Sequence, residues 1–189
     1  MLSSVAKNQS QQFHWTARYL HWSVVLLMTL LYLTAYYRKW FTTQMEVENW
    51  YLIMLHMNIG VLIFLLTVLA LMLRLLIPRP VDPQLPAWKR FAANCVQASL
   101  TGLLLLLPLV AYMGTGMKIA LFNRYLIPDF ASLEWGQWLI NDYFGTLMIS
   151  FTEPFGMMHR DWGPDILLPL LLSMHISAAL HHHWTLRDN

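Results

Sequence analysis

The sequence predicts an all-α membrane protein, a bundle of four transmembrane helices with both termini cytoplasmic and a long outer loop between the third and fourth helices. Four runs lack Asp, Glu, Lys and Arg, and each is long enough to cross a bilayer, which takes about 20 apolar residues. They are residues 19–37, 50–73, 91–117 and 166–186. Charged residues make up only 12% of the 189-residue chain, against roughly 25% in a soluble domain. This composition excludes an ordinary soluble protein.

The first apolar run is expected to remain in the mature chain. The preceding residues 1–12 are polar, and the run exceeds the roughly 7–15 apolar residues of a cleavable signal. We therefore expect a single domain over residues 1–189. Its helices are predicted at about residues 18–38, 50–77, 91–117 and 163–186.

Two connections differ in their expected roles. The segment Pro78 to Lys89 contains four prolines, so it is predicted to be a stiff, non-helical cytoplasmic spacer. In the longest connection, residues 119–126 and 138–151 are moderately apolar and are expected to lie along the outer interface. A fifth span over residues 138–158 is disfavoured, because it would bury Asp142 and Glu153 and place Pro154 inside the membrane.

Basic residues predict the orientation of the four helices. The side that carries both termini has seven of them, and the opposite side has five together with eight acids, so the positive-inside rule makes the first side cytoplasmic. The cytoplasmic set is Lys7, Arg18, Arg74, Arg79, Lys89, Arg90 and Arg187, and the outer bases are Arg38, Lys39, Lys118, Arg124 and Arg160. The negative balance outside argues mildly against electrostatic capture of an anion there.

Histidines in or beside the apolar runs are the candidate functional residues. A haem iron held between helices needs one imidazole on each side of the ring, and neutral imidazole is a common metal ligand. His21 is expected near the inner face and His56 about two turns below the outer face. His159 precedes the fourth run and His175 lies in its inner half, which gives the pairs His56 with His159 and His21 with His175. Each histidine could instead bridge helices through a hydrogen bond.

Together, several motifs resemble the bacterial cytochrome b561 family. The resemblance covers the four helices, roughly the whole chain outside residues 119–158. The motifs are Arg18-Tyr-Leu-His21-Trp22, Leu55-His56-Met-Asn-Ile-Gly60, Leu73-Arg74-Leu-Leu-Ile-Pro78-Arg-Pro80, Leu107-Pro108 and Met174-His175-Ile-Ser-Ala-Ala-Leu-His-His182-His183.

The resemblance implies a four-helix bundle with two b-type haems, for which His21, His56 and His175 match the family's iron ligands. The family usually places its two fourth-helix ligands 14 residues apart, whereas His159 and His175 are 16 apart. In a regular α-helix, 16 steps point about 160° away. His159 is therefore expected to reach inward from a non-helical turn at Gly163-Pro164.

The resemblance leaves three other site features open. Met157 or Met158 is the alternative axial ligand for the outer haem. Arg18 and Arg74 are candidates to pair with the haem propionates, because the chain has Ala70 and Gln97 where the family often has Arg and His. Both arginines would also suit a snorkelling role at the inner interface. Asn58, Thr67, Gln97 and Ser99 are polar residues in the spans that could contact a quinone or simply bridge helices.

The expected function is electron transfer across the bacterial inner membrane between a quinone, ubiquinone or menaquinone, and an outer-side donor or acceptor, which could be superoxide. One alternative is a cytochrome b anchor that relays electrons from a docked dehydrogenase or hydrogenase. For that role, Tyr125, Trp135, Trp138 and Tyr143 are a candidate docking surface. A second alternative is a haem-free helical protein that uses its histidines for proton transfer or packing.

Overall fold

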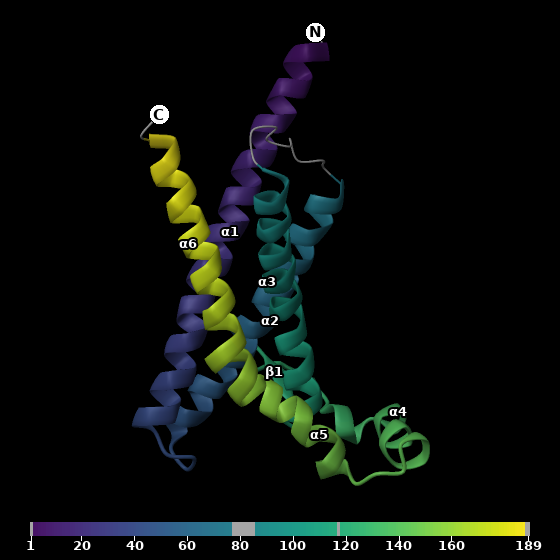
Figure 1. The fold of residues 1–189 in the computed structure, drawn as a ribbon. Coiled ribbons are helices and arrows are strands. Elements are labelled where there is room, and N and C mark those ends of the chain that lie inside the picture. Colours follow the sequence, from purple (N-terminus) through teal and green to yellow (C-terminus); the bar gives the residue numbers. More distant parts are fainter. Residues whose placement is uncertain (1, 77–85, 117, 188–189) are drawn as a thin grey trace. The chain divides into compact units, whose positions relative to one another are not determined.

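The computed structural model describes residues 2–76, 86–116 and 118–187 and is mostly helical (Figure 1). Within these residues, four helical stretches are long and apolar enough to cross a membrane. They are Trp15–Phe41, Val47–Leu76, Ala87–Gly114 and Met148–His181. The predicted class of a four-helix membrane protein is confirmed.

The chain divides into two compact units. One comprises Met1–Ile77 with Ala120–Leu126, and the other comprises Pro78–Ile119 with Ile127–Asn189. Each unit has its own core, and each holds two of the four candidate ligands. The single domain over residues 1–189 stays a prediction.

The first unit is built on α1 (Leu2–Phe41) and α2 (Val47–Leu76), which pack side by side (Figure 1). The buried face combines Met28 and Thr34 of α1 with Ile59 and Ile63 of α2. The helix α1 begins at Leu2 rather than near residue 18, as its sequence contains neither Gly nor Pro, the two residues that most disfavour a helix. Its length therefore exceeds what a bilayer requires.

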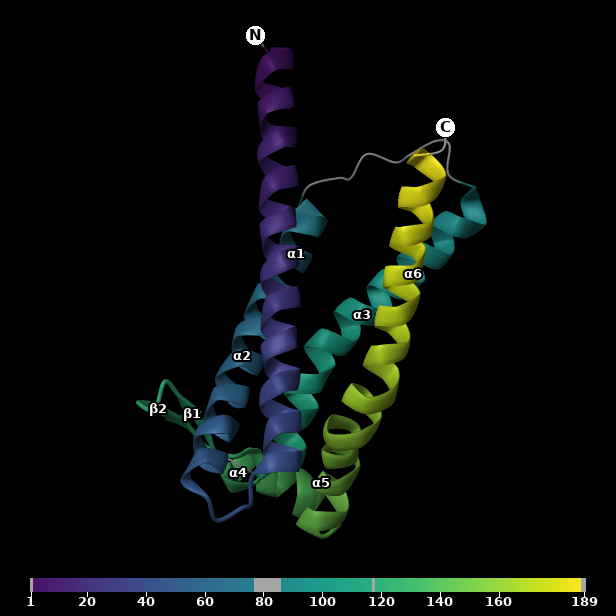
Figure 2. The same ribbon diagram turned by 90° about the vertical axis from the view of Figure 1, so that its left-hand side faces the viewer.

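The central residues of a β-hairpin, Ala120–Leu126, belong to the first unit. Its strands are β1 (Ile119–Leu121) and β2 (Tyr125–Ile127), labelled in Figure 2. The side chain of Asn58 on α2 fastens it, because Nδ2 donates to the Ala120 carbonyl oxygen at 3.0 Å and Oδ1 accepts from the Phe122 N–H at 2.9 Å. Phe122 and Asn123 have positive φ angles of 49° and 56°, as the tight hairpin turn requires. The segment expected to lie along the interface is thus a strand pair tied to α2.

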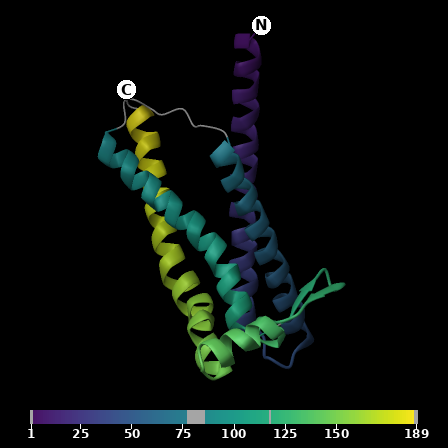
Figure 3. The same cartoon turned by 90° about the vertical axis from the view of Figure 1, so that its right-hand side faces the viewer.

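The second unit is built on α3 (Ala87–Gly114) and the fourth span, which lie against each other (Figure 3). That span is helical without a break and consists of α5 (Met148–Met157), a π-helical segment η3 (Met158–Leu167) and α6 (Leu168–Arg187). The helices α3 and α5 approach each other closely at two glycines, Gly114 and Gly156. A Cβ on Gly114 would overlap the backbone of Phe155 and Gly156, so only the absence of a side chain permits this approach.

Between β2 and α5 the chain forms a small aromatic core. It contains the short helices η1 (Phe130–Ser132), α4 (Glu134–Gln137) and η2 (Trp138–Tyr143). Phe130 is 1% exposed and Ile140 is fully buried. The Phe130 ring lies edge-on to Trp135 at 4.9 Å and stacks on Phe151 at 6.1 Å. This packing gives the long connection a fold of its own.

Three expectations about segment boundaries were wrong. The fourth helix begins at Met148 rather than near residue 163, so residues 148–151 belong to this helix. Gly163-Pro164 is not a non-helical turn, since the π-helical segment continues through it. The predicted spacer lies partly outside the described residues, but its last three residues, from Ala87, already belong to α3. Pro86 is the N-cap of this helix, and proline is tolerated at a helix start.

Candidate haem ligands and their surroundings

The four candidate histidines lie on four different helical segments. His21 is on α1 and His56 on α2, in the first unit, while His159 is on η3 and His175 on α6, in the second. His56, His159 and His175 are half-buried, and His21 is exposed. Each unit therefore contributes two imidazoles.

His56 is oriented by a hydroxyl on the neighbouring helix. Its Nδ1 lies 3.4 Å from Oγ1 of Thr34, which is 7% exposed. The Thr34 hydroxyl donates its single hydrogen to the Leu31 carbonyl oxygen at 2.8 Å. A hydrogen bond with His56 therefore requires that Nδ1–H donates and Oγ1 accepts.

His159 is oriented by a backbone carbonyl. Its Nδ1 lies 3.1 Å from the carbonyl oxygen of Leu107 on α3. A carbonyl oxygen can only accept, so the proton of the neutral imidazole is on Nδ1. The same contact holds the ring of His159 against α3.

These two contacts provide a test of whether the residues suit a haem iron. A neutral imidazole protonated at Nδ1 carries its lone pair at Nε2, and a metal-bound histidine usually donates its other ring N–H to an oxygen acceptor. His56 and His159 both have such an acceptor at Nδ1. Among the described residues, no three His, Cys, Asp or Glu side chains gather into a metal-binding group. Haem iron needs only one imidazole on each side, so the donor set suits haem.

The other predicted site residues have less specific surroundings. The ring of His21 lies edge-on to Trp22 at 5.4 Å, and the Arg18 guanidinium lies 5.3 Å from the Trp15 ring centroid. Arg74 is in the last turn of α2, where a cation interacts favourably with the helix dipole. These contacts are compatible with an interfacial position.

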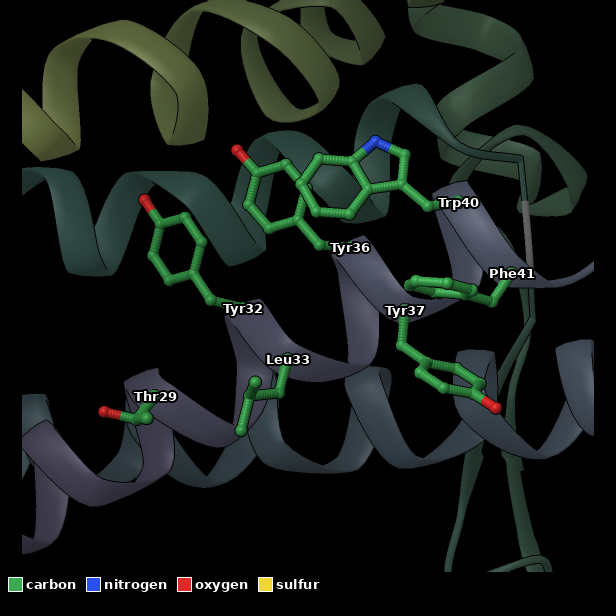
Figure 4. A pocket seen from close by; sticks show the side chains of 7 residues that line it. All are labelled: Thr29, Tyr32, Leu33, Tyr36, Tyr37, Trp40 and Phe41. Atoms are coloured by element: carbon green, nitrogen blue, oxygen red, sulfur yellow. The ribbon is translucent and has the colours of Figure 1, made fainter.

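An open hollow of about 500 Å³ on α1 was not predicted (Figure 4). Two rows of side chains at i, i+4 spacing line it, the first with Tyr32, Tyr36 and Trp40. The second row holds Thr29, Leu33, Tyr37 and Phe41. Tyr32 stacks on Tyr36 at 5.9 Å, and Tyr36 lies 4.9 Å from Trp40. The spacing of the aromatic residues could have revealed this surface, which offers flat rings for stacking.

The polar residues considered for quinone contact mostly have structural partners. Asn58 fastens the hairpin and also bonds the Met54 carbonyl oxygen at 2.7 Å. The Thr67 hydroxyl donates to Ile63 on its own helix. Gln97 accepts from Thr101 through its backbone oxygen. The hydrogen bonds of Asn58 and Thr67 thus explain these polar side chains without a quinone.

Four apolar spans, together with oxygen acceptors at Nδ1 of His56 and His159, are the features expected of a membrane cytochrome b. Comparison with known proteins agrees, since residues 12–189 match the family described as prokaryotic cytochrome b561. The chain belongs to this family. It is also 27% identical over 183 residues to "Cytochrome b561 homolog 1" of Escherichia coli (strain K12), which covers 94% of this chain and 93% of that protein. Membership implies haem b binding and electron transfer in a bacterial membrane.

Proposed function

We propose that this protein is a diheme cytochrome that moves electrons across the cytoplasmic membrane between a quinone and a donor or acceptor on the outer side. The observation that carries the proposal is the Nδ1 contact of His56 and of His159 with an oxygen acceptor. Because both rings then carry the lone pair at Nε2, both suit iron ligation. His21 and His175 would form the second pair, toward the inner side.

In this proposal the chain supplies ligands and surroundings for the redox centres. When bound, each haem supplies an iron that changes oxidation state by one electron. Thr34 and the Leu107 carbonyl hold the Nδ1 proton on His56 and His159, which keeps Nε2 unprotonated and strengthens it as a ligand. Arg18 and Arg74 are the proposed partners of the haem propionates, because a guanidinium matches carboxylate geometry.

The orientation in this proposal follows the positive-inside rule, with both termini cytoplasmic. His56 and His159 then serve the outer haem, and ubiquinone or menaquinone is the membrane redox partner. The outer side has fewer bases than acids, and one of those bases, Arg160, forms an ion pair with Glu153 at 2.8 Å. This pairing leaves less positive charge to attract superoxide, so a cationic molecule or a protein is favoured as the outer partner.

The long connection favours a second candidate function, that of a membrane anchor for a docked dehydrogenase or hydrogenase. Tyr125, Trp135, Trp138 and Tyr143 are each at least 55% exposed. Exposed aromatic side chains are enriched at protein interfaces. Copurification of such an enzyme from native membranes, and its loss when Trp135 and Trp138 are replaced by Ser, would support the anchor role.

The electron-transfer proposal can be tested in two steps. A pyridine haemochrome assay on the purified protein should give two haems b per chain, and a redox titration should show two components. In vesicles with quinol in the bilayer, reduced haem should then be reoxidised by ferricyanide added outside, an oxidant that does not cross membranes. A colourless protein, or haem that outside ferricyanide cannot oxidise, would refute the proposal.

Replacing Thr34 by Val should lower the affinity of the protein for the outer haem. Val keeps the shape of Thr but removes the oxygen that accepts from His56, and losing such a partner typically costs 10–100-fold in metal affinity. Because the contact is long, we expect about a tenfold faster transfer of one haem to apomyoglobin. Thr34→Ser should retain the wild-type rate.

Thr67→Val is the matched control for Thr34→Val. Thr67 is equally buried, at 4% exposed, and its hydroxyl bonds the carbonyl oxygen of Ile63 on its own helix. Equal effects of the two substitutions, or failure of Thr34→Ser to restore the rate, would assign Thr34 a packing role.

A further inference from the structure

The separation of His159 and His175 conflicts with a regular α-helix. The 16 steps between them would turn by about 160° beyond whole turns at 100° per residue, which places the two side chains on nearly opposite faces. The structure does not contain a regular helix here, because the segment η3 (Met158–Leu167) is π-helical. Its effect on the direction of His159 can be followed from contacts within the second unit.

Contacts within the second unit connect the two histidines along one face. The ring of His159 bonds the Leu107 carbonyl oxygen at 3.1 Å. A Cβ on Gly163, four residues later, would overlap the side chain of the same Leu107, so both residues face α3 at this point. The Leu168 N–H bonds the Gly163 carbonyl oxygen, an i to i+5 bond that stacks Leu168 one π turn above.

Leu168 and His175 both lie on α6. These residues are seven apart, which is nearly two α-turns, so they share a face. Leu168 is 3% exposed and lies in the core of the second unit. His159, Gly163, Leu168 and His175 therefore form a line along the fourth span.

The winding of the two helix types gives the same result. Residues per turn rise from 3.0 in a 3₁₀-helix to 3.6 in an α-helix and to roughly 4.4 in a π-helix, or about 82° per residue. Nine π steps and seven α steps then turn by about four whole turns, which brings His175 to within about 10° of His159. With a π rise of roughly 1.2 Å, the two residues are about 21 Å apart along the axis, the length of 14 α-helical residues.

We propose that η3 sets the register of the fourth span. Its π winding fits the 16 residues between His159 and His175 into the length of 14 α-helical residues, so that both histidines face the same side of the span. The proposal rests on the proposed function, because a shared direction matters when both residues ligate haem. It favours His159 over Met157 and Met158 as the outer ligand, since these residues lie two and one positions before it and therefore point to other faces.

Two deletions within η3 test this register. Removing Pro164 and Asp165 leaves 14 steps between the histidines, which a regular α-helix turns to within about 40° of the same face. We expect this variant to retain two haems per chain, with an unchanged low-spin signal in electron paramagnetic resonance. Removing Pro164, Asp165 and Ile166 leaves 13 steps, which turn by about 140° away, and this variant should retain one haem.

The outcomes separate this proposal from the proposed function. The haem held by His21 and His175 reports on folding, since both ligands lie outside the deletions, so loss of only the other haem shows a change of register. If the two-residue deletion loses one haem, or the three-residue deletion keeps both, the register proposal is overturned. If the wild-type protein itself lacks two haems, it is the proposed function that fails.

Discussion

Replacing His159 by Ala is expected to remove one of two haems, and replacing His56 by Ala is expected to remove the same one. Each change takes one imidazole from a proposed pair, and a haem left with a single axial ligand is no longer low-spin and is held less tightly. Because both ligands serve one iron, the double variant should also retain one haem. A pyridine haemochrome count with a redox titration of each variant measures this result.

The control for these variants is His181→Ala, because His181 is exposed near the end of α6 and is not assigned to a haem. It should retain two haems. If His159→Ala retains two haems while Met158→Leu loses one, a thioether rather than an imidazole is the outer ligand. If the His56 and His159 variants lose different haems, the proposed pairing is wrong.

A side chain on Gly114 should strongly destabilise the second unit, and one on Gly156 should destabilise it less. A Cβ on Gly114 would overlap the backbone of Gly156, and a Cβ on Gly156 would lie 2.8 Å from the Arg160 guanidinium and 3.3 Å from the Gly114 carbonyl oxygen. The Arg160 side chain can move, but the backbone at Gly114 can move only if α3 and α5 separate. We therefore expect Gly114→Ala to cost about 3 kcal/mol and Gly156→Ala about 1 kcal/mol of unfolding free energy.

Gly102→Ala provides the comparison on the same helix. Apart from its chain neighbours and the adjacent backbone of α3, no atom lies within 4 Å of the position that its Cβ would occupy, so the substitution should be neutral or stabilise α3 by up to about 1 kcal/mol. Thermal unfolding in detergent, followed through helical circular dichroism, gives the order of the three variants. A Gly114→Ala variant as stable as Gly102→Ala would contradict the close approach of α3 and α5.

The sequence was sufficient for the four spans because their signal is local. Uninterrupted apolar runs define them, and a bilayer leaves few alternatives to a helix. Hydropathy did not give the correct start of the fourth span. A charged residue and a proline, Glu153 and Pro154, argue against a membrane helix, yet both lie in α5. Both residues are exposed, while α5 as a whole packs against α3, and hydropathy does not measure such packing.

The surroundings of the histidines were less accessible to sequence reasoning. Thr34 lies 22 residues before His56, and Leu107 lies 52 residues before His159, so neither partner follows from a local pattern. The Leu107 contact uses a backbone oxygen, which every residue possesses. The π winding does not follow from the sequence, because the number of residues between His159 and His175 converts to an angle only when the helical period is known, and this period changes at Met158.

The attachment of the hairpin to Asn58 also bears on the conformational entropy of the chain. The connection between the third and fourth spans would be a long loop if only its ends were held, and such loops are unusual in compact proteins. Asn58 fixes Ala120 and Phe122, a few residues after α3 ends at Gly114. The connection is thereby divided into two shorter stretches, and the second folds around Phe130. Each stretch loses less conformational entropy on folding than one long free loop would lose. The Asn58 side chain on α2 therefore lowers the entropic cost of ordering the connection between the third and fourth spans.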